Sequence, residues 1–158
     1  MKRFILTIAL MAGISSLLPA QSLKVNELEY FEDRGINVLV YSNLYNGMFC
    51  DEKTAAIEII QRGNRIATGG GIRLMNTPEQ WDIYPVMESR TVSKKDNSIE
   101  VVLYYEAYDF RSRIKVKGKD KGVSMAVYLD KPVPDVLVGK AGMNIEFFPA
   151  TYFGRSYL

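Results

Sequence analysis

The stretch that decides the fold lies past the middle of the chain and reads IEVVLYYE, from Ile99 to Glu106. Its residues alternate, with Ile99, Val101, Leu103 and Tyr105 on one side and Glu100, Val102, Tyr104 and Glu106 on the other. Successive side chains of a β-strand point to opposite faces, so a period of two residues indicates a strand with one buried face. The stretch therefore predicts a half-buried antiparallel strand.

The next two segments repeat this pattern. Arg111, Arg113, Lys115 and Lys117 alternate with Ser112, Ile114 and Val116, and a similar alternation runs from Val123 to Asp130. The breaks on either side, residues 94–98 and 118–122, are rich in Lys, Asp, Asn, Ser and Gly, which favour turns. Residues 86–130 are therefore predicted to form a meander of four antiparallel strands.

Upstream, the segment 36–41 is a further strand candidate, and the segment 55–61 allows two interpretations. Ala and Glu give the latter some helix propensity, but Gly63 follows closely and the run is too short for a stable helix, so we expect a strand. The predicted class is all-β, an antiparallel two-sheet β-sandwich that is incomplete within this chain. Both an immunoglobulin-like and a larger mutarotase-like sandwich fit, and the meander favours the larger one.

The first 20 residues have the composition of an export signal. Met1-Lys2-Arg3 is cationic, residues 4–18 are predominantly apolar, and the small residue Ala20 marks a cleavage point. A membrane-spanning helix needs about 20 apolar residues, so a stable membrane anchor is the less favoured alternative. We expect residues 1–20 to be a signal peptide, residues 21–158 to form a β-sandwich region, and the protein to be periplasmic or secreted.

Composition excludes several kinds of chemistry. The chain has 158 residues, one Cys and no His, which rules out a Ser-His-Asp triad, a His-ligated metal site, an internal disulfide and a Cys-rich cluster. Removal of residues 1–20 leaves 18 basic and 18 acidic residues. Since nucleic-acid binding depends on an excess of Lys and Arg, no nucleic-acid partner is expected. No metal and no cofactor are expected either.

A glycine cluster and several carboxylates are the remaining candidates for chemistry. Residues 67–73, ATGGGIR, lack the Gly-Lys-Ser/Thr of a phosphate-binding loop and predict a tight turn or bulge between strands. Paired carboxylates could act in glycoside hydrolysis, but nothing marks any of them as catalytic rather than solvated. The acids considered are Asp51, Glu52, Glu79, Asp82, Glu88, Glu100, Glu106 and Asp109.

Aromatic side chains could form a platform on which sugar rings stack. They are Trp81, Tyr84, Tyr104, Tyr105, Tyr108 and Phe110, and packing in the core is the competing interpretation for each. The best candidate carbohydrate contacts are Trp81 and Tyr84. The basic residues from Arg111 to Lys117 predict a solvated strand face that protects a sheet edge.

Several segments together resemble a known family. They include residues 37–43, 45–49, 51–55, 57–60, 67–70, 76–82, 129–134 and 139–149, which read NVLVYSN, YNGMF, DEKTA, IEII, ATGG, NTPEQWD, LDKPVP and GKAGMNIEFFP. In this order they resemble the N-terminal region of long, exported glycoside hydrolase family 9 proteins of Bacteroidetes-type bacteria. The resemblance covers nearly all of residues 21–158.

The resemblance implies an endoglucanase-like parent enzyme that acts on β-1,4-linked glucans. In that family an immunoglobulin-like module and a helical (α/α)₆ catalytic barrel follow this region as downstream domains of the same polypeptide. The family's Asp-Ala-Gly-Asp stretch is absent here. No catalytic residue is therefore assigned to this chain, which is expected to be inactive alone and to meet β-glucan through the parent enzyme. The alternative is a stand-alone periplasmic carbohydrate-binding or structural interaction module.

Overall fold

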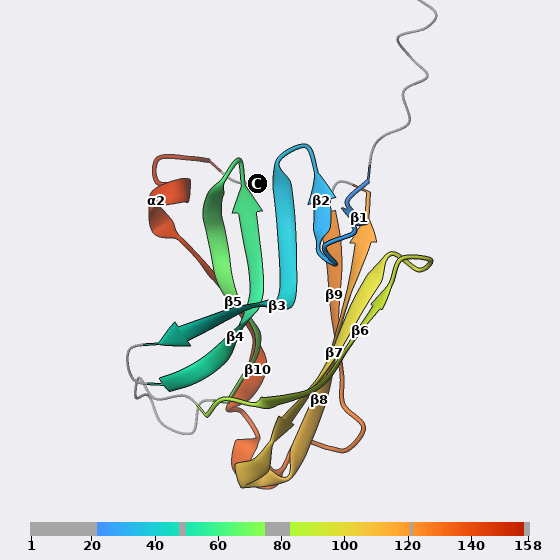
Figure 1. Cartoon of the computed structure of the whole chain (residues 1–158). Coiled ribbons are helices and arrows are strands. Elements are labelled where there is room, and N and C mark those ends of the chain that lie inside the picture. The colour runs from blue at the N-terminus through green and yellow to red at the C-terminus, as the bar shows by residue number, and fades with distance from the viewer. Residues whose placement is uncertain (1–21, 48–49, 75–82, 121, 157–158) are drawn as a thin grey trace, which may run out of the picture.

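The chain folds into two antiparallel β-sheets (Figure 1). The structure is a computed structural model that describes residues 22–47, 50–74, 83–120 and 122–156, with only the backbone described for residues 44–47 and 50–54. The strands are β1 (Lys24–Val25), β2 (Phe31–Asp33), β3 (Ile36–Gly47), β4 (Cys50–Gln61), β5 (Asn64–Leu74), β6 (Val86–Ser93), β7 (Ser98–Tyr105), β8 (Phe110–Lys119), β9 (Gly122–Tyr128) and β10 (Ala141–Phe147). The short helix α2 (Pro149–Tyr152) follows β10, and 3₁₀ turns cover Glu106–Tyr108 and Asp135–Leu137. The predicted all-β, two-sheet class is confirmed.

The smaller sheet has the order β6-β7-β8-β9 and confirms the predicted meander of four strands over residues 86–130. The ladder between β7 and β8 runs without interruption from Ser98↔Lys117 to Tyr105↔Phe110. Ile99, Val101, Leu103 and Tyr105 are buried, as their alternation predicts. The basic residues of β8 do lie on a solvated face, but β8 is flanked by β7 and β9, so the prediction that they protect an edge is wrong.

The larger sheet has the order β1-β2-β3-β4-β5-β10. The segment 55–61 lies in β4, so its prediction as a strand rather than a helix is confirmed. The last strand, β10, returns to pair with β5, with Ala141 opposite Leu74. Consecutive strands thus stay mostly within one sheet, whereas the immunoglobulin fold distributes its strands between two sheets through Greek-key connections.

The glycine cluster lies inside β5 rather than in a turn between strands. The ladders that β5 forms with β4 and with β10 both shift register at this cluster. The prediction of a bulge is therefore confirmed, and the prediction that the cluster lies between two strands is wrong. A Cβ atom on Gly71 would lie 2.4 Å from the Tyr41 hydroxyl oxygen, and one on Gly70 would lie 2.6 Å from Cβ of Ile57. These two glycines therefore let β5 approach β3 and β4 closely.

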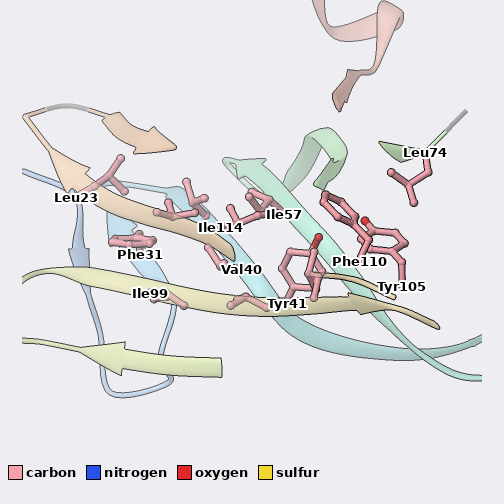
Figure 2. Packing of buried hydrophobic residues seen from close by; sticks show 14 of the residues in the cluster. Leu23, Phe31, Val40, Tyr41, Ile57, Leu74, Ile99, Tyr105, Phe110 and Ile114 are labelled. Carbon is pink, nitrogen blue, oxygen red and sulfur yellow. The ribbon is translucent and has the colours of Figure 1, made fainter. Parts of the chain in front are cut away.

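In the described part of the chain, one hydrophobic core lies between the sheets (Figure 2). Leu23 and Phe31 occupy one end of the row of buried side chains, and Leu74, Tyr105 and Phe110 occupy the other. All five are at most 3% exposed. Complete burial of a large apolar side chain contributes about 1.5–3 kcal/mol, so this core is the main source of stability.

Three side chains of the smaller sheet and its turns form hydrogen bonds with the backbone of the larger sheet. Arg90 on β6 donates to the carbonyl oxygen of Val40 at 2.8 Å and reaches Glu29. Asn97 accepts from the backbone N–H of Val25 at 2.9 Å, and the Tyr105 hydroxyl donates to the carbonyl oxygen of Ile72 at 2.6 Å. Each bond crosses from the smaller sheet to the larger one, so the sheets are held at both ends of the core.

Candidate functional site

The face of the smaller sheet that points away from the core gathers tyrosine and arginine side chains. Strand register sets two rows across it, Val86–Tyr104–Arg111 and Val102–Arg113–Tyr128. The members of a row come from neighbouring strands, and directly opposed residues share a face with Cβ atoms about 5 Å apart. We call the set Tyr104, Arg111, Arg113 and Tyr128, together with the exposed Tyr84 two residues before β6, the tyrosine–arginine face.

In the first row, Arg111 lies over the ring of Tyr104, with Cζ 3.9 Å from the ring centroid. The guanidinium also forms a bidentate contact with Glu88 at 2.9–3.1 Å. Hydrogen bonding to Glu88 raises the pKa of Arg111 above its ordinary value. The Tyr104 hydroxyl donates to Asp109, and this bond raises the pKa of Tyr104. Glu88 therefore helps to hold Arg111 over the ring of Tyr104.

In the second row, Arg113 has its Cζ 5.0 Å from the ring centroid of Tyr128. Its guanidinium is 3.4 Å from Glu100 and 3.5 Å from Asp130. Lys115, on the same strand, also contacts Glu100 at 3.4 Å. Every cation named in the two rows thus has an acidic partner, and the face offers paired donors and acceptors without a large charge of one sign.

Of the predicted carbohydrate contacts, Tyr84 lies two residues before β6 and is 63% exposed. Trp81 lies outside the described residues. Of the other aromatic candidates, Tyr105 and Phe110 belong to the core and Tyr108 packs against it, whereas Tyr104 lies on the outer face. Core packing, the competing interpretation, is thus correct for Tyr105, Phe110 and Tyr108.

Sequence reasoning missed Tyr128, which is 44% exposed. The sequence nevertheless indicates that Tyr128 is exposed. Tyr128 is two residues after Ala126 and four after Ser124, so it lies with them on the polar side of the predicted strand. Tyr84 and Tyr128 are associated with the two outer strands of the smaller sheet. Three inter-strand spacings, about 14 Å, separate β6 from β9.

The predicted carboxylates fall into ion pairs or outside the described side chains. Glu88, Glu100 and Asp109 each contact an arginine, and Glu106 is exposed. Side chains at positions 51, 52, 79 and 82 are not described. Within the described residues, no group of three or more His, Cys, Asp or Glu side chains is placed to hold a metal ion.

One carboxylate is deeply buried although sequence reasoning did not single it out. Glu58 on β4 is 1% exposed, and its two oxygens contact Arg65 at 2.8 Å and Asn43 at 3.0 Å. A buried carboxylate is costly unless it is paired and hydrogen-bonded, and here both oxygens have partners. The three residues come from β4, β5 and β3, so Glu58 serves to join neighbouring strands.

The tyrosine–arginine face can bind a flat, uncharged and hydroxyl-rich ligand. The exposed rings of Tyr84 and Tyr128 offer apolar surfaces with a polar edge, and Arg111 and Arg113 offer N–H donors beside carboxylate acceptors.

Comparisons with known proteins identify no relative. No protein family, curated protein or solved structure matches this chain significantly. None of the helices in the described part of the chain is long and apolar enough to cross a membrane.

Proposed function

We propose that this chain is the N-terminal, non-catalytic region of an exported glycoside hydrolase of the family 9 type, acting on β-1,4-linked glucans. Plant-type polysaccharide would be its substrate class. In this proposal the smaller sheet contacts the glucan through the tyrosine–arginine face, and downstream domains of the same polypeptide perform hydrolysis.

The observation that carries the proposal is the exposure of Tyr84, just before β6, and of Tyr128, which lies opposite Arg113 on β9. Sugar rings stack on exposed aromatic rings, while their hydroxyl groups need donors and acceptors close by. A neutral glucan does not require a face with a net charge, and the paired cations of this face agree with such a ligand. The resemblance of the sequence segments to the family supports the parent enzyme.

Affinity electrophoresis in gels that contain a soluble β-1,4-glucan tests glycan contact directly. We expect the glucan to retard the protein and the variants Tyr84→Ala and Tyr128→Ala to lose most of the retardation. Phe153→Ala is the matched control, since Phe153 is an aromatic residue 90% exposed beyond α2. Unchanged mobility of the wild-type protein in the glucan gel would contradict the proposal.

Catalysis is tested separately with the same purified protein. We expect no release of reducing sugar from β-glucan, because the acid and base of the parent enzyme lie in other domains. Clear release of reducing sugar would overturn the assignment as a non-catalytic region.

A stand-alone carbohydrate-binding or structural interaction module is the second candidate. The single core with hydrogen bonds between the sheets favours it, because such a core lets a domain fold by itself. Sequencing of the source DNA beyond the codon for Leu158 separates the two candidates. A frame that continues into an Asp-Ala-Gly-Asp region supports the hydrolase, and a stop codon supports the module.

A further inference from the structure

Among the described residues, the strand β9 pairs with another strand on one side only. Its seven residues pair with β8 from Lys119↔Gly122 to Arg113↔Tyr128, and it is the last strand of the smaller sheet as described. The backbone N–H and C=O groups on its other edge are therefore available to a further strand.

An apolar groove of about 390 Å³ lies beside this edge. The strands of the larger sheet contribute Ile59, Ile66, Ile145 and Phe147, and β9 contributes Val123 and Met125. Gln61 is the one polar side chain among the residues that line the groove. A sugar would find almost no hydrogen-bond partners here, so the groove differs in kind from the tyrosine–arginine face.

The edge and the groove fit the same ligand. Val123 and Met125 point from β9 toward the core side, so a strand added beside β9 would place every second side chain over the groove. Its backbone would pair with β9 while its apolar side chains contacted Ile145 and Phe147. Addition of a strand to a sheet edge is a common mode of peptide recognition.

Exposed aromatic residues lie on and after β10, one of the strands that line the groove. Phe147 is 53% exposed and contacts Tyr152 edge to face at 5.5 Å between ring centroids. Phe148 and Phe153 nearby in the chain are exposed as well. Aromatic residues are enriched at protein–protein interfaces, so this surface suits a polypeptide partner.

The charges beside β9 distinguish a foreign strand from a second copy of this chain. Lys117 on β8 is exposed, lies opposite the small residue Ser124 of β9, and has no acidic partner among the described residues. An acidic side chain on an added strand would approach Lys117 across Ser124. The strand β9 itself, Gly122–Tyr128, contains no acidic residue, so a second copy paired through β9 could not supply one.

We propose that β9 and the adjoining groove form a docking site for an extended strand of another protein, with apolar residues at every second position and an acidic residue on its outward face.

The test uses the purified full chain and a seven-residue synthetic peptide that matches the length of β9. The peptide has valine at every second position and threonine between, with one glutamate at the central outward position. We expect saturable binding by fluorescence anisotropy. The same peptide with alternate backbone amides N-methylated should have a dissociation constant at least about tenfold higher. Its methylated amides cannot donate hydrogen bonds to the edge of β9. Replacement of its glutamate by lysine should also weaken binding.

Two variants on neighbouring positions locate the site. Met125→Lys places a charge on the groove side of β9 and should abolish peptide binding. Ala126→Lys places the same charge on the outward side of the same strand and should leave binding intact. Circular dichroism checks that both variants fold, and the comparison of the methylated and unmethylated peptides on the wild-type protein does not depend on either variant.

Each outcome decides the proposal. Binding that N-methylation weakens supports it. Equal binding of the two peptides overturns it, because the backbone edge would then play no part. Absence of binding also overturns it. In that case light scattering shows whether a second copy occupies the edge, as a dimer that Met125→Lys dissociates, or whether the protein is a monomer with an empty edge.

Discussion

The two sheets of this protein differ in the regularity of their strand pairing. In the smaller sheet one register shift, between Met87 and Ser89, interrupts ladders that otherwise run evenly. In the larger sheet the ladders between β3 and β4, β4 and β5, and β5 and β10 each shift once or twice. In a ladder without register shifts, odd-numbered residues of a strand lie on one face and even-numbered residues on the other. A shift of one residue moves all later residues of that strand to the opposite face. The smaller sheet can therefore be predicted from alternation, and the larger one cannot.

The largest expected effect tests whether the two sheets share one core. Ile57 in the larger sheet and Ile114 in the smaller one are both 0% exposed. Ile57→Ala and Ile114→Ala should each lower the free energy of unfolding by about 2–5 kcal/mol in a single transition. Chemical denaturation measures both, and Lys115→Ala, on the outer face beside Ile114, is a near-neutral control. Two separate transitions in either variant would show that the sheets unfold independently.

The next effect concerns the hydrogen bonds that hold the sheets together. The side chain of Arg90 is 13% exposed and donates to the carbonyl oxygens of Val40 and Glu29. Arg90→Gln should cost about 1.5–3 kcal/mol, because hydrogen bonds from a charged donor are lost inside the molecule. Arg113→Gln, on the outer face of the same sheet, should cost less than about 1 kcal/mol. Equal losses in urea denaturation would refute the distinction between the two arginines.

The difference in strand packing is tested by adding one methyl group to each sheet. Gly71→Ala brings a Cβ atom against the Tyr41 hydroxyl group, whereas at Gly122 in β9 no atom lies within 4 Å of the added carbon. We expect Gly71→Ala to destabilise by about 1–3 kcal/mol through overpacking and Gly122→Ala to stay within about 0.5 kcal/mol of the wild type. Thermal unfolding followed by circular dichroism checks both. A tolerated Gly71→Ala would mean that β3 and β5 can separate at little cost.

The last effect is absent at neutral pH and appears only in alkaline solution. Burial raises the pKa of Tyr105 and of Tyr41 well above the ordinary value of about 10. Below pH ~10 the two tyrosine hydroxyl groups keep their protons in both the folded and the unfolded state. Above pH ~10 they lose their protons only in the unfolded state. The free energy of unfolding should therefore fall above pH ~10, by about 1.4 kcal/mol per pH unit for each tyrosine.

The variant Tyr105→Phe isolates one of these tyrosines. It should cost about 1 kcal/mol at neutral pH through loss of the bond to Ile72, and its stability should fall less steeply above pH ~10. Parallel slopes for the wild type and this variant between pH 9 and 11 would contradict the raised pKa.

The same contrast explains how much of the fold could be predicted. The faces of β7, β8 and β9 follow from alternation, and turn residues place their connections. The positive φ of Tyr41, at 48°, and the burial of Glu58 depend on pairing with distant strands. Local sequence contains no information about such pairing.

The candidate site was predictable in part for the same reason. The sequence predicts Tyr84 as a carbohydrate contact, and the structure places it, exposed, just before β6. Tyr128 was overlooked, since an aromatic residue in a strand can serve the core as well as the surface. Only strand register places it beside Arg113. The partners of Arg111 and Arg113 also come from register, because they lie on neighbouring strands.

The pairing of β10 with β5 has a consequence for the order of folding. All of the smaller sheet lies in the chain between Leu74 and Ala141, which are neighbours in this ladder. Closure of so long a loop is entropically costly, whereas each hairpin of the meander closes a short one. We expect β7 and β8 to form first and β10 to dock last. By the same reasoning β10 is the strand that opens most readily in the native state, and its amide protons should exchange with solvent well before those of β7 and β8.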